Sequence, residues 1–227
     1  MDTSGSMAGQ KIEQARRTLE YCISRLRPQD HFNVIRFSTD VESLFDAPVE
    51  ATKKHKNVGR TFAAKLEPAG GTAIHGAMVR ALEQKTSAYQ PHQVIFVTDG
   101  MPTVGPTTAA EILASTRNLQ QKNTRLFAFG VGYEVNTVLL DALASQARGR
   151  SDYVRPNEDL KPAVTALYDR ISSPVLSDIS IDFGGARVYD VYPNPIPDLF
   201  QGDQLVLFGR MRSGLERPVK VTGRVGR

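Results

Sequence analysis

The residues best suited to chemistry stand at the start of the chain. Asp2, Ser4 and Ser6 alternate in the order D-x-S-x-S, directly before a stretch with helical periodicity. Alternate residues of a loop that leaves a strand can direct one carboxylate and two hydroxyls toward the same point, and Gly5 permits the sharp backbone path. Hard oxygen ligands with few charges suit Mg²⁺ better than zinc or copper. The segment therefore predicts a magnesium site, with Mn²⁺ or Ca²⁺ as alternatives.

Two further positions fit the same site. Thr72 follows a glycine pair and precedes a helical pattern, and Asp99 with Gly100 ends the most apolar run of the chain. In open α/β sheets, ligands bind outside the carboxyl ends of the strands, where both segments are expected to lie. Each residue also has an ordinary explanation, because Ser4, Ser6 or Thr72 can cap a helix and Asp99-Gly100 can form a turn. Their common order and spacing favour one shared site.

The elements that must position these residues follow a β/α alternation up to about residue 170, which predicts a parallel sheet. The run from Val94 to Thr98 is continuously apolar, as expected for a strand that helices cover on both faces. Gly149 is expected to cap the fifth helix. The predicted strands are 31–38, 41–45, 94–98, 126–131 and a short edge strand at 153–154, and the predicted helices are 12–26, 52–66, 74–82, 108–121, 137–147 and 160–171.

The pattern changes after Pro174. Apolar residues then alternate with polar ones, and the turns are rich in Gly, Pro, Asn and Asp, so the tail is expected to be β-rich and free of helices. It is too short for an independent sandwich. We therefore expect it to pack against the first domain or against a part outside this chain.

Composition limits the kinds of protein that the chain can be. It has 227 residues, 41% apolar and 23% charged, so one globular unit with an appendage is expected and wholesale disorder is excluded. No stretch approaches the roughly 18 consecutive apolar residues of a membrane-spanning helix. The single cysteine, Cys22, excludes an intrachain disulfide framework and a thiolate zinc site, and we interpret it as a packing residue.

Charge gives little reason to expect a nucleic acid partner. The chain carries 28 Lys and Arg against 24 Asp and Glu, a net charge of only +4. The basic run at 53–56 lacks interleaved aromatic residues and any recognised RNA or DNA motif. We interpret it as a solvated helix face and expect no nucleic acid binding.

The chain resembles the von Willebrand factor type A domain, on the motifs DTSGSM, GGT and VIFVTDG, which stand in the order of that family's metal-ion-dependent adhesion site. The resemblance covers about Asp2 to Ser173. It implies a doubly wound, mostly parallel sheet flanked by helices, a Rossmann-like fold. It also implies that the hydroxyls of Ser4, Ser6 and Thr72 hold the metal, with Asp2 and Asp99 binding directly or through water.

The remainder of the chain is similar to the segment that follows this domain in inter-alpha-trypsin-inhibitor heavy-chain-like proteins. The resemblance thus implies an A domain at 1–173 and, at 174–227, a β-rich extension that belongs to a sandwich completed by an upstream domain. In the family, an apolar central strand precedes the metal motif, but only Met1 precedes Asp2 here. We therefore expect a chain that lacks that strand and the upstream domain.

These features indicate a protein-interaction module and not an enzyme. A metal held by neutral hydroxyls stays electrophilic and can accept a carboxylate from a protein partner. The relatives imply a secreted, periplasmic or cell-surface location.

A metal-dependent hydrolase is the first alternative. The chain has no G-x-S-x-G, H-E-x-x-H or P-loop motif, however, and His75 is interpreted as a solvated side chain. The second alternative is an intracellular A-domain scaffold in a larger assembly.

Overall fold

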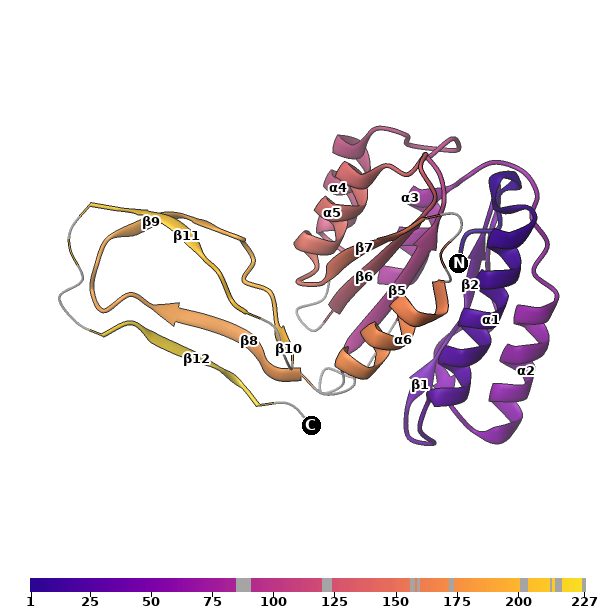
Figure 1. Ribbon diagram of the computed structural model, residues 1–227, viewed down its shortest axis with the longest axis horizontal. Coiled ribbons are helices and arrows are strands. Elements are labelled where there is room, and N and C mark those ends of the chain that lie inside the picture. Colours follow the sequence, from indigo (N-terminus) through magenta and orange to yellow (C-terminus); the bar gives the residue numbers. More distant parts are fainter. Residues whose placement is uncertain are drawn as a thin grey trace.

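The computed structural model of the chain describes residues 1–84, 91–119, 124–155, 158, 160–171, 174–200, 204–212, 214 and 218–225. Figure 1 shows two parts: an α/β part with its helices packed around a sheet, and an elongated lobe of antiparallel strands that projects from it. None of the helices in these ranges combines the length and the hydropathy that a membrane span requires.

Three parallel strands form the centre of the α/β part: β5 (His92–Thr98), β6 (Thr124–Val131) and β7 (Arg150–Val154), in the order β5-β6-β7. Every residue of β6 is buried. Full burial requires cover on both faces of the strand, which explains the apolar run 126–131 within it.

The first residues of the chain continue this sheet on the other side of β5. Met1–Thr3 lie between β5 and β2 (Ile35–Phe37): the Asp2 amide donates to the Val97 carbonyl at 2.9 Å, and the Phe37 amide donates to the Met1 carbonyl at 3.0 Å. Asp2 and Phe37 form a parallel bridge. The residues that follow Asp2 therefore leave the sheet at the carboxyl ends of the strands. The strand β3 (Val41–Ser43) pairs antiparallel with β2.

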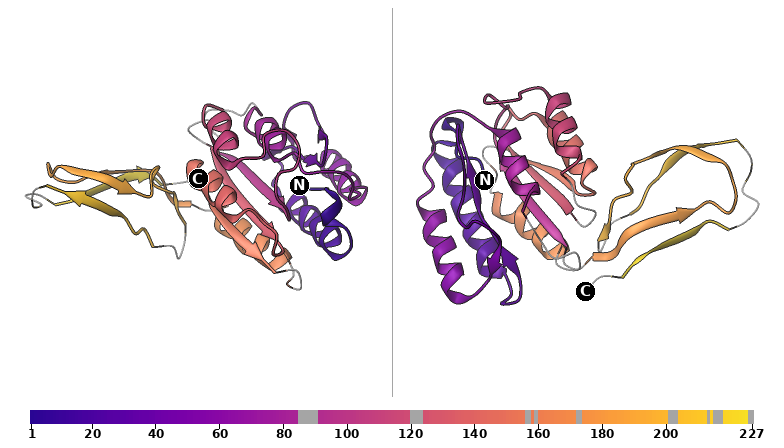
Figure 2. Two further views of the ribbon diagram at one scale, coloured as in Figure 1. Left: turned by 90° about the horizontal axis from the view of Figure 1, so that it is seen from above. Right: turned by 180° about the vertical axis from the view of Figure 1, so that it is seen from behind.

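Helices cover both faces of the sheet. On one face, Leu126 and Ala128 belong to a buried cluster with residues of α3, α4 and α5, whereas Phe127 and Phe129 point to the opposite cluster, which includes Val164 of α6. Figures 1 and 2 show the two helical layers. This arrangement confirms the predicted doubly wound α/β fold. The helices are α1 (Gln10–Arg25), α2 (Lys53–Ala64), α3 (Ile74–Leu82), α4 (Ala109–Arg117), α5 (Thr137–Gln146) and α6 (Leu160–Ile171).

One predicted strand is interrupted. The segment 31–38 forms β1 (His31–Phe32), which pairs with β4 (Val49–Glu50), and then β2. Between them, the Asn33 side chain replaces the ladder, because its Oδ1 accepts from the amides of Val34 at 2.8 Å and Phe45 at 3.0 Å. A side chain that bonds nearby backbone groups competes with regular pairing.

Gly149 does not cap the fifth helix, contrary to the expectation from the sequence. The left-handed residue after α5 is Arg148, with φ 53°, and not Gly149. A side-chain carbon on Gly149 would lie 1.8 Å from the Leu126 carbonyl oxygen. Glycine is needed there because the chain passes directly against β6. The predicted end of the α4 helix at residue 121 lies outside the described residues.

Among the described residues of the C-terminal lobe, every regular element is a strand, as expected. It consists of a sheet in the order β10-β8-β12 and a two-stranded ribbon of β9 and β11. Residues 172–173, which precede the lobe, lie outside the described part. The strands are β8 (Pro174–Asp182), β9 (Val188–Tyr192), β10 (Leu199–Phe200), β11 (Phe208–Met211) and β12 (Lys220–Arg224).

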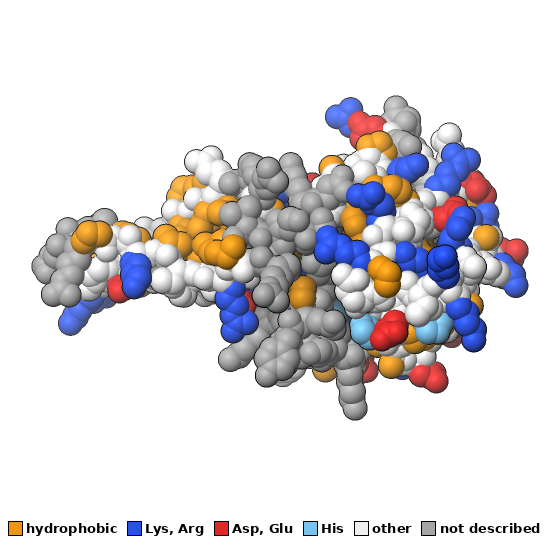
Figure 3. All heavy atoms as spheres, turned by 90° about the horizontal axis from the view of Figure 1, so that it is seen from below, with side chains coloured by type: hydrophobic (Ala, Val, Ile, Leu, Met, Phe, Trp, Pro, Cys, Tyr) orange, Lys and Arg blue, Asp and Glu red, His pale blue; other side chains and the backbone are white. Residues whose placement is uncertain are grey.

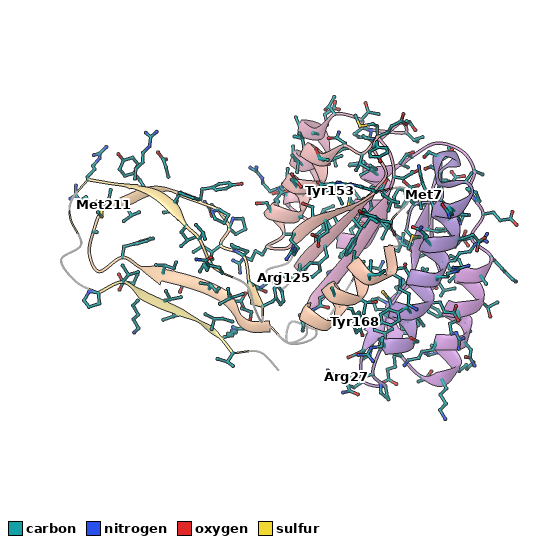
Figure 4. All side chains as sticks on the ribbon, viewed as in Figure 1. Met7, Arg27, Arg125, Tyr153, Tyr168 and Met211 are labelled. Carbon is teal, nitrogen blue, oxygen red and sulfur yellow. The ribbon has the colours of Figure 1, made fainter. Side chains whose placement is uncertain are left out.

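A buried ion pair joins the lobe to the sheet. Arg125 of β6 donates through Nε and Nη2 to both carboxylate oxygens of Asp198, and the Nη2–Oδ1 distance is 3.0 Å. Both side chains are almost fully buried. Arg125 also bonds Asp178 of β8 at 3.1 Å. Figure 4 shows Arg125 where the two parts meet. The lobe is therefore anchored by charge as well as by the packing of Phe200 against Phe127.

Cys22 offers a simple check of the packing between α1 and the sheet. It packs against the cluster that contains Phe127 and Val164, and this burial raises the pKa of its thiol to about 12. Because the thiolate is the reactive form, iodoacetamide at pH 8 is expected to alkylate the native protein at least about 100-fold more slowly than the urea-unfolded protein. Mass spectrometry of quenched samples measures both rates, and equal rates would contradict the packing.

Candidate metal centre

The D-x-S-x-S loop folds back on itself at the carboxyl edge of the sheet. Its residues Gly5–Met7 form a single 3₁₀ turn, and Met7, labelled in Figure 4, is fully buried beneath it. The Ser4 amide donates to Asp2 Oδ1 at 2.7 Å, and the Ser4 and Ser6 hydroxyl oxygens are 3.0 Å apart. The loop thus gathers one carboxylate and two hydroxyls, as their alternation predicts.

Asp2 is held by groups on two sides. Its Oδ2 accepts from the Thr98 hydroxyl at 2.5 Å, and its side chain is inaccessible to solvent. Burial raises the pKa of the Asp2 carboxyl, an effect that the hydrogen bonds from Thr98 and Ser4 oppose. Sequence reasoning did not select Thr98. Its place directly before Asp99, at the end of the apolar strand, is the signal that could have identified it.

Asp99 joins the cluster from β5. Its Oδ1 accepts from the Ser6 hydroxyl at 2.8 Å, and its Oδ2 lies 2.5 Å from the Lys11 ammonium nitrogen. The side chain of Asp99 is fully buried, whereas that of Lys11 is 27% exposed. Lys11 was not among the predicted site residues, although it stands only five residues after Ser6 on the first turn of α1.

Thr72 lies in the loop before α3 and borders the cluster formed by Asp2, Ser4, Ser6 and Asp99. Its amide donates to the Thr103 hydroxyl at 2.8 Å, and its carbonyl accepts from the Thr103 amide at 3.0 Å, so the loop is fixed on both sides. A side-chain carbon added to Gly100 would lie 3.7 Å from Ser6 Oγ and 3.8 Å from Thr72 Oγ1. The two hydroxyls therefore border the same small space, which the glycine leaves open.

The five predicted residues thus lie together, and their chemistry fits a hard divalent cation. Every donor is an oxygen, from two carboxylates and three hydroxyls. Within the described ranges, no group of three or more His, Cys, Asp or Glu side chains is placed to hold a metal, so a cation here would depend on the hydroxyls. Thr72 is buried, and the hydrogen bonds that fix it go through its backbone amide and carbonyl.

The first glycine of the pair before Thr72 has a steric role that mutation can test. Gly70 has φ +75°, and a side-chain carbon there would lie 2.5 Å from the Thr39 hydroxyl, which accepts from the Gly71 amide. Gly70→Ala is expected to lower the free energy of unfolding by about 1–3 kcal/mol. Gly105→Ala is the matched control, because φ is +71° there but nothing lies within 4 Å. Equal losses in urea denaturation would show that the contact with Thr39 is unimportant.

His75 and the basic run 53–56 lie apart from the centre. His75 is half-buried on α3, and no bond in the described structure joins it to the five site residues. In the basic run, Lys53 and Lys54 are exposed as expected, but Lys56 donates to the carbonyls of Ser24 and Leu26 at the end of α1. Part of the run therefore stabilises a helix terminus.

A doubly wound sheet with an oxygen-rich cluster at its carboxyl edge places the chain among the open-sheet α/β domains. The sequence comparisons identify the family more narrowly. A family model described as the von Willebrand factor type A domain matches residues 1–153, and the chain belongs to this family.

Longer relatives match almost the whole chain. It is 30% identical over 218 residues to inter-alpha-trypsin inhibitor heavy chain H2 of Sus scrofa, and 31% identical over 220 residues to heavy chain H4 of Homo sapiens. The alignments cover 92% and 93% of this chain but only 23% and 24% of those proteins. The chain therefore spans about a quarter of the length of these curated relatives.

Solved structures share the fold. A von Willebrand factor type A protein from Catenulispora acidiphila superposes with a TM-score of 0.73 at 18% identity, over 99% of this chain and 57% of that one. Proximal thread matrix protein 1 from the mussel byssus, described with a zinc-occupied MIDAS motif, gives a TM-score of 0.56 at 20% identity, over 73% of this chain and 42% of that one.

Proposed function

We propose that the chain is a protein-interaction module that binds an acidic group of a partner protein through a divalent cation. The observation that carries the proposal is the linked cluster of Asp2, Ser4, Ser6 and Asp99, which Thr72 borders across Gly100. Mg²⁺ is the cation that this donor set favours, with Mn²⁺ or Ca²⁺ as alternatives.

The residues of the site would have different roles in binding the cation. The hydroxyls of Ser4, Ser6 and Thr72 would hold the cation directly, while Asp2 and Asp99 would bind it directly or orient its water. The Thr98 hydroxyl and the Ser4 amide keep the Asp2 carboxylate in one orientation. A cation bound mainly by neutral groups supplies an electrophilic centre for the carboxylate of a partner.

We propose a non-enzymatic, adhesive role. The five site residues include no histidine or cysteine, and the longer relatives that align with this chain are named as inhibitor heavy chains. A metal-dependent hydrolase and an intracellular scaffold remain the alternatives. A secreted, periplasmic or cell-surface location is the one that the heavy-chain relatives favour. The partner is expected to be a protein and not a nucleic acid.

We also propose that residues 1–173 form the A domain and that the lobe at 174–227 belongs to a sandwich completed by an upstream domain of the full-length protein. The lobe exposes large apolar side chains, among them Tyr192, Phe208 and Val221, and Figure 3 shows hydrophobic atoms gathered on it. Exposed apolar patches of this kind mark surfaces that another part covers. Binding of a fluorescent apolar dye should fall when the upstream domain is present.

The adhesive role is tested with arrays of peptides that differ only in Asp or Glu against Asn or Gln. The wild-type chain should bind carboxylate peptides in millimolar Mg²⁺, and binding should disappear in EDTA, because the cation is the contact. The amide peptides serve as the matched control. Binding that persists in EDTA, or that does not distinguish acid from amide, would contradict the proposed mechanism.

A further inference from the structure

Lys11 places a positive charge inside the candidate metal centre. Its ammonium nitrogen lies 2.5 Å from Asp99 Oδ2 and 3.2 Å from the Ser6 carbonyl oxygen. Both carboxylate oxygens of Asp99 are then engaged, since Oδ1 accepts from the Ser6 hydroxyl. The ammonium therefore bonds an oxygen of Asp99, a residue that a divalent cation would also bind.

The position of this lysine in its helix is unusual. Lys11 is the second residue of α1, and the preceding Gly9 supplies no side-chain cap. The first turn of a helix favours negative side chains because the helix dipole is positive there. The ion pair with the fully buried Asp99 offsets that cost and gives the carboxylate a counter-charge.

The side chain also has a route out of the site. Lys11 is 27% exposed, whereas Asp99 is inaccessible. A lysine ammonium on its flexible four-carbon stem is a compact, well-hydrated charge that can move into solvent. Of the two groups in the pair, the lysine is the one with access to solvent.

We propose that Lys11 is an internal competitor of the divalent cation, so that it sets the cation concentration at which the site fills. The inference rests on the proposed metal site and adds a regulating residue to it. With Lys11 in place, two carboxylates and one ammonium give the cluster a net charge of −1, compared with −2 once the lysine has moved away. The cation must therefore displace or repel the ammonium, and its affinity is lower than the five oxygen donors alone would give.

Calorimetric titration with Mg²⁺ alone tests this inference on the wild type and three variants. Lys11→Met should bind Mg²⁺ at least tenfold more tightly, and Lys11→Arg, which keeps the charge, should stay near the wild type. Lys54→Met is the matched control, because Lys54 is exposed on α2 and its loss changes the net charge equally. Without metal, Lys11→Met should be less stable than the wild type, and saturating Mg²⁺ should close that gap.

A second readout needs no variant. The side-chain ¹³Cε and ¹⁵Nζ signals of Lys11 in the wild type should shift during a Mg²⁺ titration, with the same midpoint as the heat of binding. An affinity of Lys11→Met within twofold of the wild type, together with an unchanged Lys11 signal, would overturn the inference but leave the metal site intact. If neither protein binds Mg²⁺ or Mn²⁺, the inference and the proposed metal site are both overturned.

Discussion

Replacing Asp198 with alanine is expected to lower the free energy of unfolding by about 3–5 kcal/mol. The substitution removes the carboxylate that accepts two hydrogen bonds from the buried Arg125 guanidinium, and the Asp178 amide loses its acceptor at 3.2 Å. The Arg125 guanidinium keeps its bond to Asp178 but loses the bidentate carboxylate that offsets the cost of burying its charge. Urea denaturation followed by circular dichroism measures the loss.

A surface pair gives the matched control for this prediction. Arg36 and Glu42 also form an ion pair, but both side chains are at least one-third exposed. Glu42→Ala is therefore expected to cost at most about 1 kcal/mol. The double variant Arg125→Met/Asp198→Leu should recover much of the loss, since apolar groups of similar size carry no desolvation cost. A loss for Asp198→Ala no larger than the control would show that the pair does not anchor the lobe.

The second large effect concerns the cation. Thr72→Ala is expected to weaken Mg²⁺ binding by at least about 100-fold, because it removes a proposed hydroxyl ligand. In Mg²⁺ at 100 times its dissociation constant, the wild type should gain about 2.7 kcal/mol of stability, and the variant should gain almost none. Thermal denaturation with and without Mg²⁺ measures both values.

Thr72→Ser is the matched control, because it keeps the hydroxyl and removes only a methyl group. It should bind Mg²⁺ nearly as well as the wild type. Thr72 is also a cleaner target than Asp2, whose carboxylate accepts from the Ser4 amide and the Thr98 hydroxyl. Asp2→Ala would leave two buried donors unsatisfied at about 1–3 kcal/mol each, so lost binding and lost stability would be mixed. Equal Mg²⁺ binding by Thr72→Ala and Thr72→Ser would contradict the proposed role.

Most of the α/β fold could be predicted from the sequence, because burial on both faces produces a readable pattern. The continuous apolar run 94–98 lies in β5, and the stripe 74–82 coincides with α3. The break at Asn33 could not be predicted, since it depends on a bond to the amide of Phe45, twelve residues away. The reason for Gly149 depends on contact with β6, which no local pattern reveals.

Some residues of the candidate site could be predicted from the sequence and others could not. Asp2, Ser4 and Ser6 could be grouped by alternation, and Thr72 and Asp99 by their positions at loop-to-helix and strand ends. Thr98 and Lys11 were missed because their roles come from side-chain contacts across 96 and 88 residues. Nothing in the spacing of Lys11 distinguishes it from an ordinary surface lysine on an amphipathic helix.

A crystal structure determined in Mn²⁺, with data collected at the manganese absorption edge, tests the central claim most directly. We expect one anomalous peak at the carboxyl edge of the sheet, within coordination distance of the hydroxyls of Ser4, Ser6 and Thr72, and with Asp2 and Asp99 at or next to the ion. We also expect the Lys11 ammonium to have moved from Asp99. An empty cluster at saturating Mn²⁺, or a peak bound elsewhere, would contradict the account.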